Sequence, residues 1–574
     1  MTLPASLYFI LAAIGHSFLF ASALYLIYAL LAVLTRSVKF STVIYLILAI
    51  GLQVLFILDG LVFTLYRFHI NGFVIDLFFG AGTDVFVFDF WLYLKFALII
   101  ISVAVLPYCL ALLIRPYIYR YLNKKRIVAI VGFAVSCLVV SHVGHAVASA
   151  ARNMSIERSA TVLPYFYPLT ANSLMKKIGI AVDDEIEGHT FNLRSANLNY
   201  PLHPIEKPDS LPSYNILHIV IDSWNPTTFD SITTPEIHQF SKQAAYYSNH
   251  FSSHCGTSGG IFGMFFGLPF SYQKDFEIAQ LSPLFIDMLV NEGYNIQVFP
   301  SATFEKPPFH KRIFRRVPHI NTKTEGKTPF ERDNKITEMA IDFLKEQNRS
   351  KPFYAFIFYD LPHAISIPEE CRAKFQPSWD EPDYLALKND IDRTPFFNLY
   401  KNCVYHTDNL IGQVLKQVEE SDLLDNTIVI ITADHGQEFN ENKKNYWGHT
   451  SNFSDWQLKV PFILFDPSGR NPQVYNHMTT HYDIIPTILS RYFGVKNSTS
   501  DYSLGYDIDN SAGRYPIVVG DNNTFGFVFE DKIVTTNEVG SVKVTDRQLN
   551  PIPRSSLKSV ELQQAIEIKN RFYK

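Results

Sequence analysis

Four long apolar runs in the first 151 residues limit most strongly how this chain can fold. Residues 3–35, for example, contain no charged side chain, whereas about 20 apolar residues are enough to cross the hydrocarbon core of a membrane. In all four runs the charged residues lie near the ends, which is typical of membrane spans. The sequence therefore predicts an α-helical transmembrane domain over residues 1–151, with four helices at about 3–35, 40–66, 90–114 and 127–151.

The distribution of charge separates this region from the rest of the chain. Residues 1–150 contain nine of the 50 Lys and Arg residues and four of the 54 Asp and Glu residues, which gives them a net charge of +5 and leaves −9 for the remainder. The chain as a whole is 48% hydrophobic and only 18% charged, against roughly 25% charged residues in an average soluble protein, which excludes a chain that coats a nucleic acid. We therefore expect no nucleic-acid partner.

Basic residues in the connections predict the orientation of the helices. Arg36 and Lys39 lie between the first two predicted helices, and five basic residues lie between the third and the fourth. The loop at 67–91 carries one Arg and three Asp. Because basic connections stay in the cytoplasm, we expect both termini and the soluble part in the periplasm, outside a bacterial inner membrane.

The soluble part begins with a polar, proline-punctuated stretch at 152–212, which we interpret as a periplasmic linker. Apolar strands then alternate with helical patterns, which predicts an α/β domain with a mostly parallel sheet over residues 213–505. Ligands bind beyond the carboxyl ends of such strands. Three apolar strand-like segments are each followed within two residues by an aspartate, namely Asp222, Asp360 and Asp434.

Two further features of the soluble part are less specific. Short β-rich runs near the end of the chain predict a small β-rich C-terminal subdomain at 506–574. The chain has five cysteines, an odd number that does not suggest a disulfide framework. A bond between Cys371 and Cys403 is left open, because both lie in the part that we expect outside the cytoplasm.

The strongest chemical signal is the motif Asp434-His435-Gly436, which follows an apolar strand and is followed in turn by His449. A carboxylate and an imidazole on one tight turn offer two ligands to a single divalent metal. Taken alone, the Asp-His dipeptide has an alternative interpretation, in which the aspartate caps a helix and the histidine beside it is unrelated.

A second signal is the small-residue loop Cys255-Gly-Thr257-Ser258, which runs into an apolar helix. The backbone N–H groups at such a helix start attract an anion. A hydroxyl placed there becomes a nucleophile if a metal lowers its pKa. Thr257 is the predicted nucleophile and Ser258 the alternative, and His363 follows another strand at the same predicted edge of the sheet.

These motifs together resemble the sulfatase branch of the alkaline phosphatase superfamily, over roughly residues 213–505. The resemblance rests on five sites that occur in the same order: Asp222, Cys-Gly-Thr257, His363, Asp434-His435-Gly and His449. The loop at Thr257 is similar to that of phosphoethanolamine transferases, which share helical membrane domains with lipoteichoic-acid synthases. The whole chain looks more like the YejM/PbgA group of inner-membrane proteins, through Ile14-Gly-His16, Ser141-His142-Val143, Tyr167-Pro-Leu-Thr170-Ala and Gly260-Ile-Phe-Gly263.

Three departures from that group affect the expectations. Its members usually have five spans, so whether a further helix precedes the four predicted here is left open. Better-known members have lost part of the Asp-His-Gly motif, which this sequence keeps. Where members carry paired arginines in a segment that contacts lipid A, this chain has Asn172-Ser173 and then Lys176-Lys177, which weakens the inference of lipid A sensing.

The resemblance implies specific roles for the residues of these motifs. One divalent metal, with Zn, Mn, Mg and Ca not distinguished, would be held by Asp222, Thr257, Asp434 and His435, with Thr257 as the nucleophile. His363 and His449 would bind the substrate's oxyanion, the leaving group or a second metal. The Cys-x-Pro-x-Arg signature of formylglycine sulfatases is absent, so sulfate-ester hydrolysis is only the second alternative.

These expectations favour an inner-membrane hydrolase or transferase of phosphoryl or phospho-head groups, acting in outer-membrane lipid homeostasis. Its partner would be a membrane lipid, either lipid A or a phospholipid head group. The alternative is a non-catalytic, lipid-sensing regulator of lipopolysaccharide synthesis with a cytoplasmic protein partner. The complete set of metal ligands favours the enzyme, and the whole-chain resemblance favours the regulator.

Overall fold

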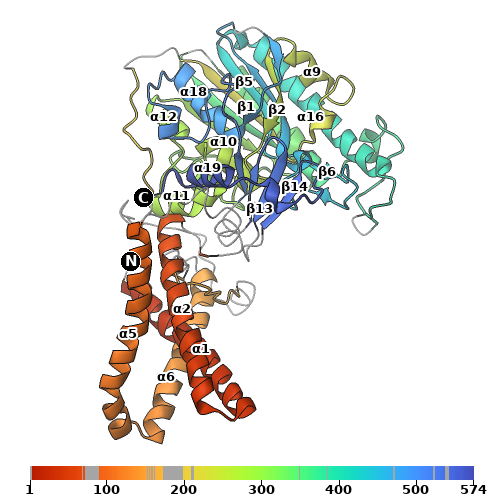
Figure 1. Cartoon of the computed structure of the whole chain (residues 1–574). Coiled ribbons are helices and arrows are strands. Elements are labelled where there is room, and N and C mark those ends of the chain that lie inside the picture. Colours follow the sequence, from red (N-terminus) through yellow and green to blue (C-terminus); the bar gives the residue numbers. More distant parts are fainter. Residues whose placement is uncertain are drawn as a thin grey trace. The chain divides into compact units, whose positions relative to one another are not determined.

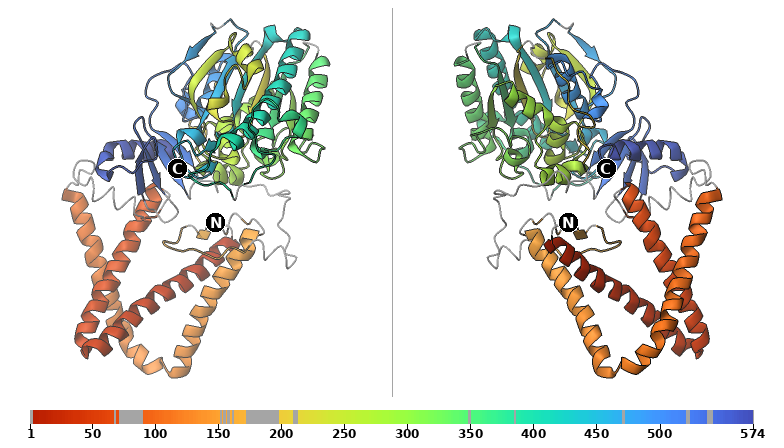
Figure 2. Two further views of the ribbon diagram at one scale, coloured as in Figure 1. Left: turned by 90° about the vertical axis from the view of Figure 1, so that its right-hand side faces the viewer. Right: turned by 90° about the vertical axis from the view of Figure 1, so that its left-hand side faces the viewer.

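The computed structural model divides the chain into two compact units, residues 1–195 and 196–574 (Figure 1). Two further views show the elements of each unit from other sides (Figure 2). The described residues are 3–66, 69–70, 90–150, 153, 156, 159–160, 162–171, 198–208, 213–347, 350–383, 386–469, 472–520, 524–536 and 542–573.

Long apolar helices make up most of the described part of the first unit. They are α1 (Leu3–Thr35), α2 (Val38–Tyr66), α5 (Phe90–Tyr121) and α6 (Lys124–Ala150). All four are long and apolar enough to cross a membrane, which confirms the predicted transmembrane domain. The third helix runs about two turns past its predicted end, so Arg115 and Arg120 lie on a helix and not in a loop. Arginine is a good helix former, and its long side chain can reach the membrane surface.

Small residues allow α1 and α6 to pack closely. A Cβ atom on Gly15 of α1 would lie 2.6 Å from the Cα atom of Leu138 on α6, so a larger residue does not fit there. Ala12 of α1 and Cys137 of α6 are also buried. Helices within a membrane associate through such close backbone contact, since lipid tails give no hydrophobic driving force between them.

Three histidines of these helices hold the segment 162–171, which follows α6. His16 Nε2 and His145 Nδ1 each donate to a backbone carbonyl oxygen of the segment, at 2.8 and 3.0 Å. His142 Nδ1 accepts a backbone N–H of the segment at 3.3 Å. The Phe166 ring contacts the rings of both His16 and His142. Three of the sequence segments that carry the family resemblance therefore contact one another.

A buried carboxylate near the end of α2 binds the residues that follow this helix. Asp59 accepts hydrogen bonds from His69 Nδ1 at 2.6 Å and from the Ile70 N–H at 2.7 Å. The Tyr165 hydroxyl donates to the Ile70 carbonyl oxygen at 3.2 Å. Most of the acidic loop used to predict the orientation, residues 67–91, lies outside the described residues. The Lys176-Lys177 pair lies entirely outside them.

The second unit is built on an eight-stranded sheet with the order β10-β2-β8-β5-β1-β4-β3, in which β9 also pairs with β2. The strands predicted from the sequence are buried and parallel neighbours: β1 (Asn215–Ile221), β4 (Phe353–Tyr359) and β5 (Thr427–Ala433). The others are β2 (Ala245–Phe251), β3 (Asn295–Pro300), β8 (Lys459–Phe465), β9 (Gln473–Tyr475) and β10 (Thr479–Thr480). Among the described strands of this sheet, β8 alone runs antiparallel to its neighbours, which confirms the mostly parallel α/β domain.

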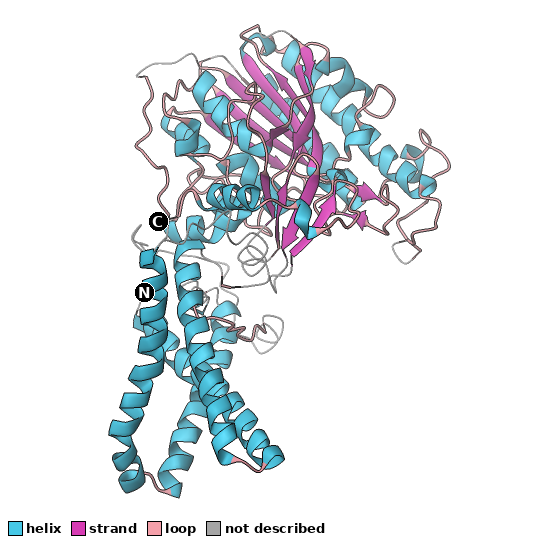
Figure 3. Cartoon of the chain, in the orientation of Figure 1, coloured by secondary structure: helices cyan, strands magenta, loops and turns pink. Residues whose placement is uncertain are grey.

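Helices cover both faces of this sheet (Figure 3). On one face lie α9 (Pro235–Ser241), α14 (Pro329–Lys345) and α16 (Thr394–Glu420). On the other lie α10 (Thr257–Phe266), α12 (Leu284–Asn291) and α18 (Ile484–Tyr492). Alternate residues of β1 face the two helix layers. Ile219 belongs to the core that includes α16, whereas His218 contacts Phe265 of α10. Polar side chains of a site are therefore confined to the ends of the strands.

A smaller antiparallel sheet confirms the predicted β-rich C-terminal subdomain. Its strands are β11 (Ile517–Gly520), β12 (Phe525–Val528), β13 (Lys532–Thr536) and β14 (Val542–Asp546), followed by α19 (Ser559–Asn570). All five cysteines lie within the described residues, and none forms a disulfide bond with another. The bond between Cys371 and Cys403 that the sequence left open is therefore not formed.

Candidate metal and active site

The register of the central strands brings three aspartates to one edge of the sheet. Ile221 of β1 is paired with Tyr359 of β4 and with Ala433 of β5. Each of these three residues is the last of its strand, and the strands are parallel. The residues that follow them therefore leave the sheet at the same level. Those next residues are Asp222, Asp360 and Asp434.

The turn that carries Asp434 and His435 is held by the backbone around it. Asp434 Oδ1 accepts the N–H of Ser223 at 3.1 Å and that of His435 at 2.8 Å. Gly436 follows, and a Cβ atom there would lie 2.3 Å from the Trp456 carbonyl oxygen, so only glycine fits. Asp434 Oδ2 is buried and accepts no hydrogen bond of normal geometry from the described residues.

The hydrogen bond of one ring nitrogen determines what His435 offers to the site. Its Nδ1 lies 2.9 Å from the Gly436 carbonyl oxygen, which can only accept, so Nδ1 carries the hydrogen and Nε2 presents a lone pair. Nε2 lies 3.7 Å from Asp222 Oδ1, 3.5 Å from Asp434 Oδ2 and 3.3 Å from Thr257 Oγ1. Atoms with lone pairs from four side chains therefore face a common point.

The hydroxyl of Thr257 reaches this point because α10 begins beside the turn. Thr257 is the first residue of α10 and Gly256 is its N-cap. One turn further, a Cβ atom on Gly260 would lie 2.1 Å from the Asp434 carbonyl oxygen, so the helix requires glycine there to approach. Thr257, and not the alternative Ser258, makes the contact with the imidazole.

Burial gives these groups unusual protonation. It raises the pKa of Asp222 well above its ordinary value, and repulsion from Asp434 adds to this effect. Burial also raises the pKa of Asp434 to about 7 and lowers the pKa of His435 to about 3. Two carboxyl groups this close together in a buried place are not both ionised unless a positive charge is bound between them.

The donor set fits a divalent metal ion. Ligand atoms of Asp222, Asp434 and His435 lie within 4.8 Å of one another. Carboxylate and imidazole are common ligands of Zn and of related divalent ions. A backbone carbonyl that fixes the second ring nitrogen, as at His435, is usual for histidines that bind metal. The unbonded Asp434 Oδ2 is available as a ligand, and the structure thus brings the predicted metal-binding residues together.

His363 lies at the same edge, in the short helix α15 (Leu361–Ala364). Its Nδ1 is 3.5 Å from Asp360 Oδ1, and Asp360 Oδ2 accepts a hydrogen bond from Arg332 at 3.1 Å. The contact with Asp360 raises the pKa of His363 to about 9, so this imidazole is charged at neutral pH. Ligand atoms of Asp222, Asp360 and His363 form a second group within 4.8 Å of one another.

His449 directly follows β7 (Trp447–Gly448), a short strand that comes after β5 and pairs with β6 (Glu438–Phe439). Its ring centroid lies 4.4 Å from that of His435 and 5.2 Å from that of His363. Its Nδ1 lies 2.8 Å from Gln437 Oε1, and the N–H of the following residue donates to the Cys255 carbonyl oxygen at 2.8 Å. Burial lowers the pKa of His449 to about 2, so this ring is neutral.

Two residues of the site were not predicted from the sequence. Ser223 donates from its hydroxyl to Asp222 Oδ1 at 2.8 Å, while its N–H holds Asp434, in a left-handed conformation with φ of 62°. Its position directly after Asp222 could have indicated this role. Arg332 reaches Asp360 from α14, which has no local sequence signal.

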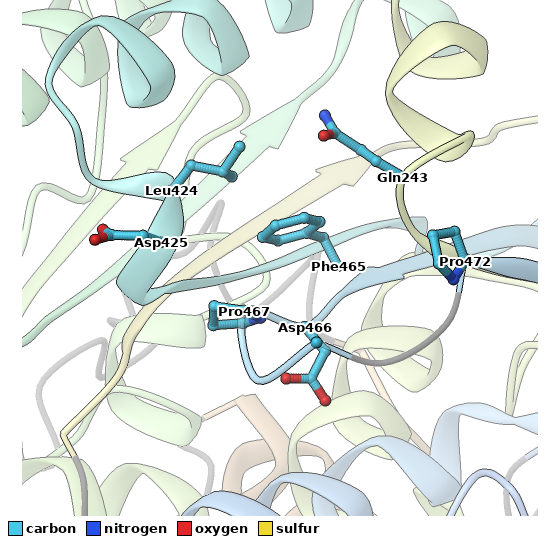
Figure 4. A pocket seen from close by; sticks show the side chains of 8 residues that line it. Gln243, Leu424, Asp425, Phe465, Asp466, Pro467 and Pro472 are labelled. Carbon is cyan, nitrogen blue, oxygen red and sulfur yellow. The ribbon is translucent and has the colours of Figure 1, made fainter.

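A cavity of about 430 Å³ lies at the opposite edge of the sheet and is separate from this site (Figure 4). Leu424 and Asp425, just before β5, line it together with Phe465 at the end of β8. Because β5 begins near the cavity and ends at the candidate site, the whole length of the strand lies between them.

Comparisons with known proteins agree with this organisation. Residues 214–495 match the family model Sulfatase, and residues 1–207 match a model described as a domain of unknown function, DUF3413. The chain is 24% identical over 561 residues to the inner membrane protein YejM of Salmonella typhimurium, which covers 95% of this chain and 87% of that protein.

Solved structures that match part of this chain include a phosphonate monoester hydrolase of Agrobacterium radiobacter. It has 16% identity and a TM-score of 0.49, and the match covers 62% of this chain and 95% of that chain. Another is the C-terminal periplasmic domain of EcEptC from Escherichia coli, in complex with Zn. It has 14% identity and a TM-score of 0.44, over 55% of this chain and 92% of that chain.

Proposed function

We propose that this chain, whose two regions match the Sulfatase and DUF3413 family models and which is similar to the inner membrane protein YejM, is a metal-dependent transferase or hydrolase of phosphate esters. The observation that carries the proposal is the convergence of Asp222, Asp434 and His435 Nε2 beside the Thr257 hydroxyl. Burying these two carboxyl groups in their ionised forms costs stability unless a cation binds them. Their presence at one point is therefore best explained by a functional metal site.

The nucleophile and the metal act together in this mechanism. Asp222, Asp434, His435 and Thr257 would hold one divalent metal, which when bound lowers the pKa of the Thr257 hydroxyl and neutralises charge on the phosphoryl oxygens. The Thr257 oxygen attacks phosphorus and releases its proton to solvent. An Oγ–P bond forms while the bond from phosphorus to the leaving oxygen breaks.

The two remaining histidines complete the reaction. His363 is charged at neutral pH and can protonate the leaving oxygen. His449 donates its Nδ1–H to Gln437, so its Nε2 lone pair can accept a hydrogen bond from an attacking hydroxyl or bind a second metal. Attack by water on the phosphothreonine gives hydrolysis, and attack by a second substrate hydroxyl gives transfer.

The membrane helices favour a lipid substrate. A catalytic domain on the same chain as four apolar helices acts close to a membrane surface, so we propose a phospholipid head group or lipid A as the substrate, at the periplasmic face. The role would be in outer-membrane lipid homeostasis. Sulfate-ester hydrolysis is the weaker alternative, because Cys255 is followed by Gly-Thr-Ser-Gly and not by a formylglycine signature.

A second candidate function is a non-catalytic lipid sensor that regulates lipopolysaccharide synthesis. The similarity to YejM supports it, because that similarity extends over 95% of this chain and includes the helices. Such a regulator would use the same site to bind a ligand and would contact a cytoplasmic protein through its spans.

Metal content and turnover distinguish these functions. Full-length protein in detergent would be loaded with one divalent metal at a time and assayed on bis(4-nitrophenyl) phosphate, 4-nitrophenyl phosphate and 4-nitrophenyl sulfate. We expect bound metal and turnover of at least one phosphate ester. Asp434→Asn should lose both, because it removes a metal-binding carboxylate oxygen.

Asp466→Asn is the matched control, since it makes the same chemical change beside the distant cavity. It should retain both metal and turnover. A metal-loaded wild-type protein that hydrolyses none of the three esters would overturn the enzymatic proposal and favour the regulator. Preferential turnover of the sulfate ester would favour the sulfatase alternative.

A further inference from the structure

A chain of buried imidazoles lies behind the turn that carries Asp434, and the proposed reaction does not use it. His481 Nε2 lies 3.2 Å from the Asp434 carbonyl oxygen, and its Nδ1 lies 2.9 Å from His250 Nε2. His250 Nδ1 in turn lies 2.9 Å from Thr479 Oγ1. Both imidazole rings are fully buried.

The positions of the hydrogen atoms follow from the groups at the two ends. A carbonyl oxygen only accepts, so His481 Nε2 must carry a hydrogen. Burial lowers the pKa of His481 to about 3 and that of His250 well below its ordinary value, so both rings are neutral. His481 Nδ1 therefore accepts from His250 Nε2–H, and His250 Nδ1 accepts from the Thr479 hydroxyl. All four ring nitrogens are thus satisfied in one pattern.

The Asp434 carbonyl oxygen lies where the turn that carries the metal ligands contacts α10, the helix that carries Thr257. Ser252 Oγ lies 2.5 Å from it and 2.8 Å from the His254 carbonyl oxygen, so its single hydrogen faces both acceptors and the contact with Asp434 is the shorter one. Gly260 of α10 packs directly on it, because a Cβ atom there would lie only 2.1 Å away. The same helix begins with Thr257. The carbonyl oxygen that His481 binds is therefore also the atom on which α10 packs.

The imidazole chain is supported by three strands. His250 on β2 is the register partner of Thr479 on β10. The His250 ring also stacks on Phe462 of β8, with 4.3 Å between the ring centroids. A side chain held by a sheet in this way keeps one orientation, so it can transmit that orientation to the turn.

We propose that His481, supported by His250, is a positioning residue that fixes the Asp434 carbonyl and thereby sets the spacing between the metal ligands and Thr257. The inference rests on the proposed function, because it concerns the same metal. His481 is fully buried and contacts the backbone behind the turn, so its effect on substrate is indirect.

The affinity for Zn²⁺ of the full-length protein in detergent tests this role without any assay of activity. His481→Phe keeps a flat ring of similar size and removes the donor, and we expect it to weaken the Zn²⁺ Kd about tenfold or more. His481→Gln keeps an N–H donor, and its Kd should stay within about threefold of the wild-type value. Ser252→Ala removes the other donor to the same oxygen and should weaken Zn²⁺ binding as well. If His481→Phe does not fold, Ser252→Ala still tests the inference.

His218→Phe is the matched control. His218 is also buried, but it lies on β1 and is hydrogen-bonded to the Tyr354 hydroxyl at 3.2 Å. This variant should lower the Tm of the metal-free protein and leave the Zn²⁺ Kd unchanged. An effect of His218→Phe on the Kd as large as that of His481→Phe would overturn the positioning role.

The Zn²⁺ binding experiment distinguishes a wrong positioning role from a wrong proposed function. Tight Zn²⁺ binding by the wild type and equally by His481→Phe and Ser252→Ala overturns only the positioning role. A wild-type protein that binds no Zn²⁺ or other divalent ion overturns the proposed function and the positioning role together.

Discussion

At the scale of single residues, the chemistry of the site depends on which atoms are already engaged by the protein. Asp434 Oδ1 and His435 Nδ1 are hydrogen-bonded to backbone groups, whereas Asp434 Oδ2 and His435 Nε2 face Asp222 and Thr257. The unengaged atoms converge and the engaged atoms hold them in place. A site arranged in this way is organised before a metal binds, which reduces the cost of ordering it.

The nucleophile and a metal ligand should therefore fail together when either is removed. We expect Thr257→Ala to lower kcat/KM on a phosphate ester by about a thousandfold or more while the protein still binds metal. Asp434→Asn should cause a similar loss by losing the metal. The double variant should be no worse than either single variant, because both changes disable one unit. Steady-state kinetics together with metal analysis would check this, and multiplicative losses in the double variant would contradict it.

At the scale of helices and strands, the sequence predicts the elements that carry a strong local pattern. The continuous apolar runs of β1, β4 and β5 identify them as buried parallel strands, and the aspartates after them indicate the site. Long uncharged runs identify the membrane helices in the same way. Each of these signals lies within a single segment, so it requires no knowledge of what packs against it.

Features set by distant partners could not be predicted. The antiparallel direction of β8 is decided by its neighbours β2 and β5 and not by its own residues. The end of α5 passes Arg115, because a helix can continue after its apolar run ends. Arg332 and His481 take their roles from groups that are close only in the folded chain.

One contact between two helices should make stability depend on pH. Asp408 on α16 accepts the N–H groups of Glu236 at 3.0 Å and Ile237 at 2.9 Å in the first turn of α9. Burial raises the pKa of Asp408 from 3.8 to about 7. The folded state therefore binds this proton more tightly than the unfolded state, so the free energy of unfolding falls as the pH rises from about 4 to about 7.

Asp408→Asn cannot ionise and lacks this dependence. Its Tm relative to the wild type should therefore shift in favour of the variant between about pH 5 and about pH 8. Asp342→Asn on the exposed surface of α14 is the control and should show no such shift. Thermal unfolding of the three proteins at both pH values would check this. A Tm difference for Asp408→Asn that is the same at both values would show that the buried carboxylate does not control it.

For the whole molecule, the number of membrane crossings determines on which side of the membrane the soluble unit lies relative to the start of α1. The connection between α1 and α2 consists of Arg36 and Ser37, and that between α5 and α6 consists of Leu122 and Asn123. Both connections are so short that each helix pair must turn back at the same membrane surface. Basic residues lie in or beside both connections, so the positive-inside rule predicts that the connections are cytoplasmic.

Four crossings between Leu3 and Asn153 then put these two residues on the same side of the membrane. A periplasmic reporter such as an alkaline phosphatase should be inactive when it is fused after Lys39 and active when it is fused after Asn153, and a fluorescent reporter that matures only in the cytoplasm should give the reverse result. The orientation depends on charge, so replacing the basic residues around the second connection with serine should lower the difference between the two fusions. An active periplasmic reporter after Lys39 would reverse the orientation of all four helices. It would also place the Thr257 site in the cytoplasm, where periplasmic lipid could not be its substrate.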